Sequence, residues 1–391
     1  MNELIIENIK TIIKNKINLK KKIVLHEPSL DAIDKKNIID CVQSSFVSTV
    51  GAYSNKFEDK LKNITRSKYV ISTVNGTSAL HAILFALNIG NNDEVIVPSL
   101  TFVGTANAIK YCGAEPNFVD VSNKTFGIDP IKLKKYLEKI CVIKNNLCFN
   151  KKTGKYIKGL ICVHVFGHAA EILKINRICK KFKLPLIEDA AEALGSYYKH
   201  KHLGTFGNFG MLSFNGNKIV TTGGGGAILT NNKKLYEKLI KLVTINKEKH
   251  KFEYFYKSVG FNYKMPSINA ALGLGQLNNL NRTIEKKRKI FELYREIFNK
   301  IEGVKLLKEP INSKSNYWLN TLILDRKYIK SKNKIINILI DNNFLCRPLW
   351  FPLHLSPQFK KCEKDNLDIT IDLYKRAINI PSSANLIKKF K

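Results

Sequence analysis

The stretch SFNGNKIVTTGGGG, residues 213–226, places one lysine between a short apolar strand and four consecutive glycines. A lysine held in a dry pocket beside other cations can lose its proton and attack an aldehyde, so Lys218 is a candidate Schiff-base residue. The glycines let the backbone approach a flat ligand closely. Taken alone, the same run is equally typical of a tight turn.

A buried strand that ends in an acid precedes this lysine, in the stretch LIEDAAE at residues 186–192. Asp189 stands where a carboxylate can hold a pyridine nitrogen protonated, which is the property that makes pyridoxal 5'-phosphate an electron sink. Glu192 either hydrogen-bonds the phenol oxygen of that cofactor or begins a helix. Together the two stretches predict a pyridoxal phosphate enzyme in which Lys218 and Asp189 are catalytic.

Short β-branched runs alternate with amphipathic stretches of helical length from about residue 69 onward. This alternation predicts an α/β fold with a mostly parallel central sheet, and ligands gather beyond the carboxyl ends of such strands. The expected strands are 69–74, 94–98, 116–121, 159–165 and 185–189, with 211–214 and 227–230 on either side of the lysine.

Three parts of the chain follow from these patterns. Residues 1–22 form an amphipathic helical extension whose isoleucines share one face; it lies on a membrane surface, on the protein's own body or on a partner subunit. Residues 23–270 form the large cofactor-binding domain. Residues 271–391, with a long Lys-rich helical stretch at 277–300, form a smaller α+β domain. A Lys/Asn-rich segment of low complexity spans 143–158.

Composition excludes several classes of protein. With 391 residues, 44% of them hydrophobic, the chain is long and apolar enough to build a large core. Its formal charge of +33 comes mostly from Lys spread along the whole length without a nucleic-acid-binding motif, so we expect no nucleic-acid partner. The eight cysteines include no C-x-x-C pair, which predicts reduced thiols and no metal site. Lacking a signal peptide and an apolar run of about twenty residues, the chain is predicted to be cytoplasmic, without stable membrane insertion.

Further candidates stand in the loops that follow the strands. Gly76 and Thr77 open a helix, so they either cradle a phosphate or form an ordinary helix cap. Phe102 either stacks on a cofactor ring or belongs to the core. Ser213 either donates its hydroxyl to the same phosphate or is a strand-end serine.

These motifs together resemble the sugar aminotransferases of the DegT/DnrJ/EryC1/StrS family, which are pyridoxal phosphate enzymes of fold type I. The resemblance covers nearly all of residues 23–391, and its motifs occur in the family's order. The matching segments are 25–28, 46–51, 75–80, 101–107, 188–192, 213–226, 260–265 and 352–354.

The resemblance implies a role for each cofactor contact. It implies a Schiff base at Lys218, a salt bridge from Asp189 to the pyridine nitrogen, and stacking by Phe102. It implies phosphate contacts from Gly76, Thr77 and Ser213. It also implies that Asn262 reaches the phosphate in the neighbouring subunit, so that the active unit is a homodimer.

One position departs from the family pattern: many relatives place an acid between the glycines after the lysine, where this chain has Gly224. Together with segment 46–51, this resembles the branch that aminates UDP-linked 4-keto-6-deoxy-N-acetyl sugars on the way to bacillosamine or legionaminic acid. The implied partners are a nucleotide-linked 4-ketosugar and an amino donor, expected to be glutamate.

Four further residues are predicted to contact the substrate. Lys247 and Arg347 supply cations for a diphosphate, and Asn320 and His354 are candidates for the sugar or the nucleotide. Three alternatives remain open: a GDP- or dTDP-sugar aminotransferase, a sugar dehydratase using pyridoxamine phosphate, and a basic binding protein that keeps the fold as a scaffold. Dehydratases of this fold carry His at the position of Lys218, which argues against the second.

Overall fold

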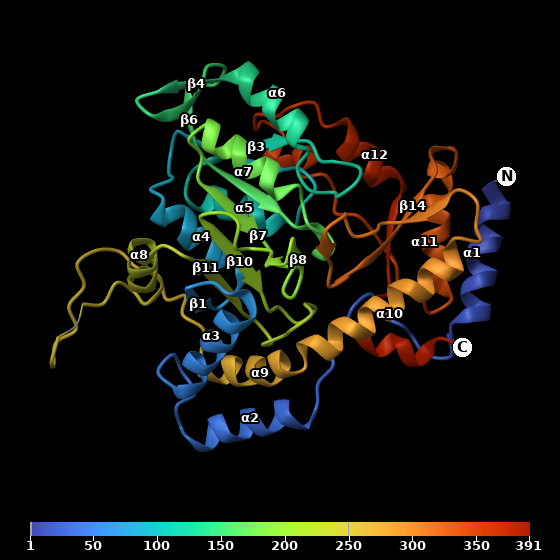
Figure 1. Cartoon of the computed structure of the whole chain (residues 1–391), viewed down its shortest axis with the longest axis horizontal. Coiled ribbons are helices and arrows are strands. Elements are labelled where there is room, and N and C mark those ends of the chain that lie inside the picture. The colour runs from blue at the N-terminus through green and yellow to red at the C-terminus, as the bar shows by residue number, and fades with distance from the viewer. Residues whose placement is uncertain (1, 249) are drawn as a thin grey trace.

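A nine-stranded sheet forms the centre of the computed structural model, which describes residues 2–248 and 250–391 (Figure 1). Seven strands lie along one path, and the hairpin β4 (Cys141–Lys144) and β5 (Leu147–Asn150) pairs with β6. The path runs through β1 (Tyr69–Thr73), β11 (Gly226–Thr230), β10 (Phe209–Ser213), β7 (Leu186–Asp189), β6 (Lys155–Val163), β2 (Asp93–Pro98) and β3 (Glu115–Val119).

The predicted mostly parallel sheet is confirmed along the seven-strand path, with one antiparallel strand, β11, next to the edge strand β1. β10, β7, β6, β2 and β3 run parallel, whereas β11 is antiparallel to both β1 and β10. No helix lies between β10 and β11, and a chain without a crossover helix returns antiparallel to the strand it has just left. The Lys/Asn-rich segment 143–158 is not irregular, because it builds β5 and parts of β4 and β6.

Helices cover both faces of this sheet, and the strands are apolar on both sides for that reason. In β2, Val95 and Val97 belong to one buried cluster while Ile96 between them belongs to another. The covering helices are α4 (Gly76–Ala86), α5 (Val103–Tyr111) and α8 (Lys233–Val243) on one side and α6 (Pro130–Ile140) and α7 (Ile172–Lys181) on the other. Helices α2 (Ala32–Gln43), α3 (Ala52–Thr65) and α9 (Ser267–Asn278) pack beneath the edge that β1 forms.

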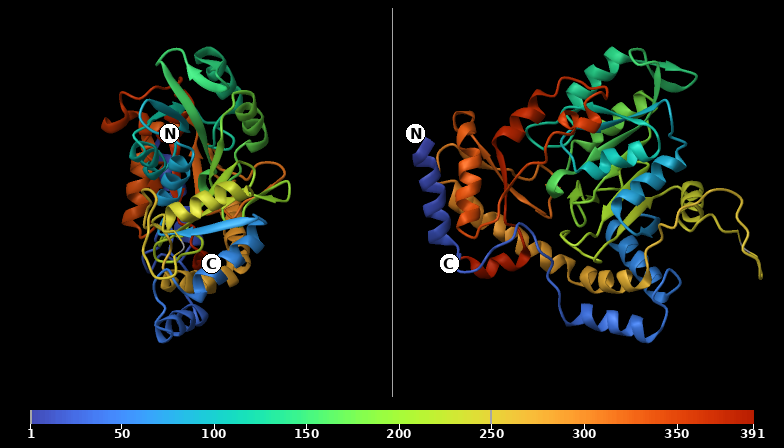
Figure 2. Two further views of the ribbon diagram at one scale, coloured as in Figure 1. Left: turned by 90° about the vertical axis from the view of Figure 1, so that its left-hand side faces the viewer. Right: turned by 180° about the vertical axis from the view of Figure 1, so that it is seen from behind.

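A second, antiparallel sheet of four strands lies toward the C-terminus. Helix α10 (Leu280–Phe298) runs from α9 to this sheet in all the views (Figures 1 and 2). The strands, in order, are β12 (Val304–Leu306), β14 (Asn320–Leu324), β16 (Ala377–Ile380) and β15 (Arg347–Pro348), with α11 (Lys332–Asp341) and α12 (Asp368–Arg376) alongside. A small sheet of β8 (Tyr197–Tyr198), β9 (Lys201–His202) and β13 (Ser313–Lys314) joins the two parts.

The N-terminal helix α1 (Asn2–Lys16) packs on the chain's own body. Its face of Ile5, Ile9 and Ile13 is buried in a cluster with residues of α10, α11 and the C-terminal sheet. Of the three alternatives for the amphipathic extension, the structure therefore shows packing on the protein's own body. In the described residues, no helix has both the length and the apolar character needed to cross a bilayer. The domain boundaries at 22/23 and 270/271 remain predictions.

Candidate active site

A cavity of about 310 Å³ opens where the carboxyl ends of β7 and β10 meet the N-terminus of α4. This is the edge at which parallel sheets place their ligands. Its lining includes Gly76, Thr77, Phe102, Asp189, Glu192, Ser213 and Lys218, together with Thr105, Asn215, Asn217, Trp318 and Trp350. The tertiary structure thus brings seven of the sequence-predicted residues to one cavity.

Lys218 lies on the loop between β10 and β11, with its amine directed into the cavity. Its Nζ donates a hydrogen bond to Oε1 of Glu192 at 3.0 Å and lies 3.9 Å from the centroid of the Trp318 ring. The side chain is only 13% exposed. A primary amine with one carboxylate and one aromatic face around it is positioned to meet a ligand in the cavity.

At two of the four glycine positions after the lysine, the backbone requires glycine. Gly223 has a φ of +79°, a left-handed conformation that residues with a side chain rarely adopt. At Gly226, a Cβ would lie 2.5 Å from the carbonyl carbon of Asn75, so only glycine lets β11 pass the N-terminus of α4. The run therefore lets β11 pass close to the N-terminus of α4, whose Gly76 and Thr77 line the cavity.

Asp189 ends β7 and is 5% exposed. Its Oδ2 accepts from the Thr105 hydroxyl at 2.7 Å and its Oδ1 from the backbone N–H of Ala191 at 3.1 Å. Since Thr105 has one hydroxyl proton, the 3.0 Å contact between the hydroxyls of Thr101 and Thr105 is donated by Thr101. Burial raises the pKa of Asp189, against the lowering by the Thr105 hydrogen bond and the nearby Lys218 charge. A cation in the cavity would offset that cost of burial.

Glu192 holds the lysine from the other side of the cavity. Its Oε2 accepts from the backbone N–H of Phe166 at 2.8 Å, while Oε1 accepts from Lys218. Burial raises the pKa of Glu192, and the Lys218 charge lowers it. Of the two sequence readings of Glu192, the structure shows a buried side chain facing the cavity, outside any helix.

The N-terminus of α4 supplies free donors to the same cavity. Asn75 is the N-cap, and its side chain accepts from the N–H of Ser78 at 2.7 Å. Among the described residues, the N–H groups of Gly76 and Thr77 have no hydrogen-bond partner. Unpaired N–H groups at the positive end of a helix dipole suit a phosphate. Helix cap and phosphate cradle are therefore compatible interpretations of this segment.

The residues present fit pyridoxal phosphate. The free donors of α4 and the hydroxyls of Thr77 and Ser213 suit its phosphate, and buried Asp189 suits a protonated ring nitrogen. Phe102 is 56% exposed although it lines the cavity, so its ring is free to stack on a flat ligand. The Lys218 amine completes the set.

Five of the sequence-predicted residues lie outside this cavity of the single chain. Asn262 and Lys247 are exposed beyond α8, and Lys247 packs over the ring of Tyr254. Arg347 is exposed on β15, and Asn320 is buried in β14, where its Nδ2 donates to Ser382. His354 is buried with Nδ1 2.7 Å from the hydroxyl of Ser99.

Three residues that sequence analysis did not single out contribute to the site: Thr105, Trp318 and Trp350. Thr105 stands inside the matched segment 101–107, and the other two are the only tryptophans of the chain. A rare aromatic residue far along the sequence gives no sign of which cavity it will line, so only the fold could assign the tryptophans.

Comparisons with known proteins agree with this geometry. The family model described as the DegT/DnrJ/EryC1/StrS aminotransferase family matches residues 28–389. The chain is 36% identical over 366 residues to a GDP-perosamine synthase of Escherichia coli O157:H7, with 94% of each chain covered. It is 29% identical over 371 residues to a UDP-4-amino-4,6-dideoxy-N-acetyl-beta-L-altrosamine transaminase of Helicobacter pylori, again with 94% of each covered.

Solved structures show the same likeness. Helicobacter pylori PseC, an aminotransferase involved in the biosynthesis of pseudoaminic acid, superimposes with a TM-score of 0.84 at 27% identity, covering 93% of this chain and 95% of that one. The predicted family and the fold of type I pyridoxal phosphate enzymes are thereby confirmed.

Proposed function

Because this chain belongs to the DegT/DnrJ/EryC1/StrS aminotransferase family, whose enzymes depend on pyridoxal phosphate, we propose that it aminates carbon 4 of a UDP-linked 4-keto-6-deoxy-N-acetyl sugar, with glutamate as amino donor. The transaminase of Helicobacter pylori is named for a UDP-linked 4-amino-4,6-dideoxy-N-acetyl sugar, which has this pattern. The product would feed surface sugars of the bacillosamine or legionaminic type, and we place the reaction in the cytoplasm.

One observation carries the proposal: the Lys218 amine, the Asp189 carboxylate and the free N–H groups of α4 share one cavity. Bound pyridoxal phosphate supplies an aldehyde carbon for the amino group and an electron-withdrawing pyridinium ring. Lys218 Nζ serves as the base that removes the proton from the α-carbon of the amino donor and as the acid that later delivers a proton to carbon 4 of the sugar.

The neighbouring residues orient and hold charge. Asp189 would keep a proton on the ring nitrogen through its negative charge, and Thr105 fixes the direction of the carboxylate through Oδ2. Gly76, Thr77 and Ser213 would hold the phosphate, and Phe102 would lie against the ring, since all four line the cavity. Glu192 holds the Lys218 amine at 3.0 Å and lines the cavity, where it would hydrogen-bond the cofactor phenol oxygen.

The assay is a substrate panel. Purified protein with pyridoxal phosphate is given glutamate and UDP-, GDP- or dTDP-linked 4-ketosugars, with and without an N-acetyl group, and aminated product is measured by mass spectrometry. We expect kcat/KM to be at least tenfold higher for the UDP-linked N-acetyl substrate than for the others. Amination of none of the ketosugars would refute the proposed substrate class.

A GDP-linked 4-ketosugar is the second candidate. The observation in its favour is the 36% identity to a GDP-perosamine synthase, which exceeds the 29% identity to the UDP-sugar transaminase. Higher kcat/KM for the GDP substrate in the same panel would assign this activity and overturn the UDP assignment.

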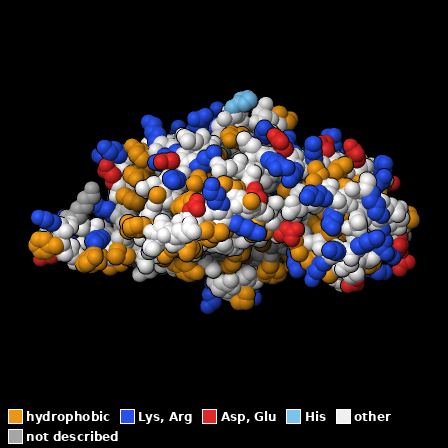
Figure 3. All heavy atoms as spheres, turned by 90° about the horizontal axis from the view of Figure 1, so that it is seen from below, with side chains coloured by type: hydrophobic (Ala, Val, Ile, Leu, Met, Phe, Trp, Pro, Cys, Tyr) orange, Lys and Arg blue, Asp and Glu red, His pale blue; other side chains and the backbone are white. Residues whose placement is uncertain are grey.

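We also propose that the active unit is a homodimer. The arm at residues 250–259 projects from the body (Figure 1) and exposes Phe252, Tyr254 and Phe255, of which Phe252 is 77% exposed. Phe46 and Val50, before α3, are exposed as well. Seen from below, hydrophobic side chains gather toward the arm end of the molecule (Figure 3). Apolar surface of this kind is typical of an interface.

Subunit mixing tests whether Asn262 reaches the partner's site. Mixing inactive Lys218→Ala and Asn262→Ala subunits should produce hybrid dimers in which one site carries both lesions and the other carries none, so activity should return. The control is each variant mixed with itself, with exchange verified by differently tagged subunits. If exchange occurs and activity does not exceed the sum of the parents, Asn262 does not act across the interface.

We also propose that Lys247 and Arg347 bind the substrate diphosphate, and that Asn320 and His354 bind the sugar or the nucleotide. For exposed Lys247 and Arg347, such contact requires the substrate to extend beyond the cavity or the partner to bring them closer. Replacing either by Ala should raise KM for the nucleotide sugar at least threefold with KM for glutamate unchanged. Equal KM values in variant and wild type would remove that residue from the binding site.

A further inference from the structure

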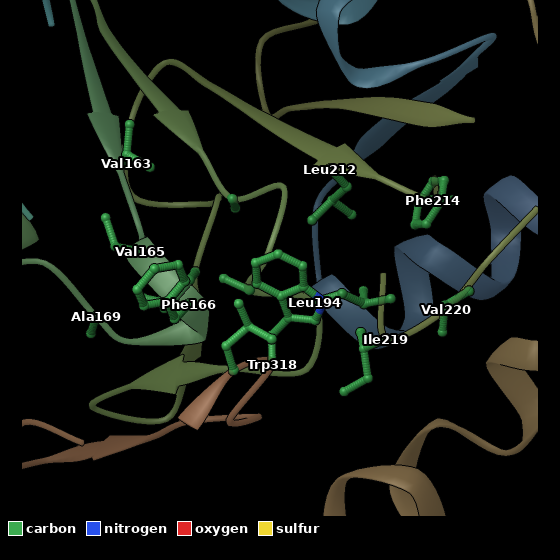
Figure 4. Close-up of a cluster of buried hydrophobic side chains, with 14 of the residues drawn as sticks. Val163, Val165, Phe166, Ala169, Leu194, Leu212, Phe214, Ile219, Val220 and Trp318 are labelled. Carbon is green, nitrogen blue, oxygen red and sulfur yellow. The ribbon is translucent and has the colours of Figure 1, made fainter. Parts of the chain in front are cut away.

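Trp318 forms an aromatic wall against the reacting amine. It precedes β14, is 5% exposed, and lies in a buried cluster with Phe166, Leu194 and Ile219 (Figure 4). The Nζ of Lys218 is 3.9 Å from its ring centroid and 3.0 Å from Glu192. The face of an indole ring attracts a cation more strongly than other aromatic rings do. The lysine is thus held between a carboxylate and a ring face.

Every hydrogen-bonding group of Trp318 is engaged, one by the neighbouring Asn316 and two by distant segments of the chain. Its backbone N–H donates to Oδ1 of Asn316 at 2.8 Å, and its indole Nε1–H donates to the backbone carbonyl of Asn217 at 2.8 Å. Its carbonyl accepts from the Nζ of Lys287 at 3.1 Å. A residue fixed at all three groups has one backbone position and one ring orientation, which is the condition for a precise site.

Asn316 ties both anchors of the lysine together. While its Oδ1 holds Trp318, its Nδ2 donates to the carbonyls of Glu192 at 2.8 Å and Leu194 at 2.9 Å. Its backbone N–H donates to the hydroxyl of Ser196 at 2.9 Å. One buried side chain therefore sets the spacing between Glu192 on the central part and Trp318 on the C-terminal part.

Lys287 fixes Trp318 from behind at a cost in stability. It lies in the middle of α10, is fully buried, and donates to the carbonyls of Trp318 and Ser382. In the described part of the chain, no carboxylate pairs with it. Burial holds the pKa of its amine well below the usual value for lysine. Burying an apolar side chain at this position would cost less free energy than burying an ammonium group. The presence of lysine here therefore needs a reason, and its two hydrogen bonds supply one.

We propose that Trp318 is a positioning residue for the Lys218 amine, and that Asn316 and Lys287 hold its ring at the distance from Glu192 at which the amine meets the ligand. This inference rests on the proposed role of Lys218 as the reacting base. It also gives the C-terminal sheet a task at a site otherwise built by the central sheet, since a shift of α10 relative to the cavity would move the ring.

The first test removes the ring. In Trp318→Leu, kcat should fall at least tenfold while KM for glutamate and for the ketosugar stays within threefold, because the amine is misplaced and binding groups remain. Trp318→Phe keeps a ring face and should recover part of kcat. In cofactor-free protein, acetylation of Lys218 by a limiting amine-specific reagent, followed by mass spectrometry, should be at least threefold faster in Trp318→Leu.

That acetylation rate separates this inference from the proposed function, since it reports how the amine is held whatever reaction it serves. An unchanged acetylation rate together with kcat within twofold of wild type would overturn the positioning role. Loss of all activity in Lys218→Ala with unchanged behaviour of Trp318→Leu would leave the proposed function intact and refute only this inference.

The second test leaves the ring in place and covers the case in which Trp318→Leu does not fold. Lys287→Met removes the hydrogen bond to the Trp318 carbonyl, and Lys332→Met is its matched control. Lys332 is also buried, donates to the carbonyl of Tyr374 at 2.7 Å and lies over that ring, but it does not touch the cavity.

Both variants are made with Trp350→Phe, so that Trp318 is the sole tryptophan. We expect Lys287→Met to lower kcat at least threefold and to shift the emission maximum of Trp318, whereas Lys332→Met should leave both at the values of the parent. Equal kcat and emission in the two lysine variants would overturn the assignment of Lys287.

Discussion

Glu188 and Asp189 are consecutive residues of β7, both buried and both acidic, yet the structure gives them different hydrogen-bond surroundings. Because side chains alternate along a strand, the two carboxylates lie on opposite faces of the sheet. Glu188 accepts from Nε2 of His164 at 2.9 Å and from three backbone N–H groups, those of Gly204, Phe206 and Gly207 at 2.8, 2.5 and 2.6 Å. Within residues 2–248 and 250–391, Asp189 accepts only from Thr105 and Ala191.

The difference teaches how to separate a structural acid from a functional one. A carboxylate offers about four acceptor sites, so Glu188 is saturated by the protein while Asp189 keeps capacity that faces a cavity. His164 belongs to the hydrogen-bond network that saturates Glu188. Its Nδ1 accepts from the N–H of Ala170, so the proton is on Nε2 and is donated to Glu188. Burial is common to both acids, so the feature that makes Asp189 the candidate is its unfilled hydrogen-bond capacity at the cavity.

The largest effect on turnover is expected for Lys218→Ala, which removes the amine that faces the cavity. We expect turnover to fall by about 10³-fold or more, about 4 kcal/mol in the activation barrier, because the amine is both the anchor of the cofactor and the proton carrier. Lys218→Arg should fail too, since a guanidinium does not give up its proton. Steady-state amination measures the effect, and Lys233→Ala on the exposed surface of α8 is the control. Activity within about tenfold of wild type would remove Lys218 from the mechanism.

Asp189→Asn tests the acid that faces the cavity. A neutral amide of the same shape cannot balance a pyridinium charge, so the rate should fall by about 10²-fold, about 3 kcal/mol. Cofactor affinity should fall less than the rate. Single-turnover kinetics and a fluorescence titration with pyridoxal phosphate separate the two quantities. An unchanged rate would mean that another acid, Glu192 first, holds the ring nitrogen.

Glu188→Gln tests the saturated acid next to it and should affect stability rather than chemistry. The amide NH₂ would face backbone donors, so the free energy of unfolding should fall by about 2 kcal/mol. At a temperature where the variant is folded, kcat should stay within about threefold of wild type, a barrier change of under 1 kcal/mol. Urea unfolding and an assay on the same sample measure both. If the rate falls as far as in Asp189→Asn, the separation between the two acids is wrong.

The last prediction concerns the pH dependence of stability, which His202 contributes without touching the cavity. Burial lowers the pKa of His202 to about 4, and its Nε2 accepts the N–H of Gly195 at 2.9 Å, which requires the neutral ring. Between pH 6.5 and 4 the unfolded chain binds this proton and the folded chain does not. Stability from this group is therefore present above about pH 6.5 and is lost as the pH falls toward 4, by up to about 1.4 kcal/mol per pH unit.

His202→Gln keeps an acceptor for Gly195 and removes the titration. Urea unfolding at a series of pH values should show that the variant loses less stability on acidification than wild type does. The difference in slope should be up to about 1.4 kcal/mol per pH unit, the value for one bound proton. His168, whose pKa burial also lowers to about 4, keeps contributing in the variant. Identical slopes in wild type and variant would show that His202 does not titrate in this range.

Local patterns in the sequence predicted most of the fold and the chemical centre of the site. Expected strands at 69–74, 94–98 and 185–189 match β1, β2 and β7 to within a residue or two. Lys218, Asp189 and Gly76 were predictable because each follows a strand, and parallel strands bring their ends to one edge. The antiparallel β11 was not predictable from its own residues, because its direction depends on the length and shape of the preceding loop.

The sequence by itself determined the α/β fold, the family, and the presence of a lysine and an acid at the strand ends, since these rest on periodicity and on motifs of a few neighbouring residues. Only the tertiary structure showed that Glu188 is saturated by hydrogen bonds while Asp189 keeps unfilled capacity at the cavity, and that Trp318, held by Asn316 and Lys287, packs against a lysine a hundred residues away in the sequence. Hydrogen-bond saturation and cavity lining are properties of contacts between distant segments, and no local pattern records them.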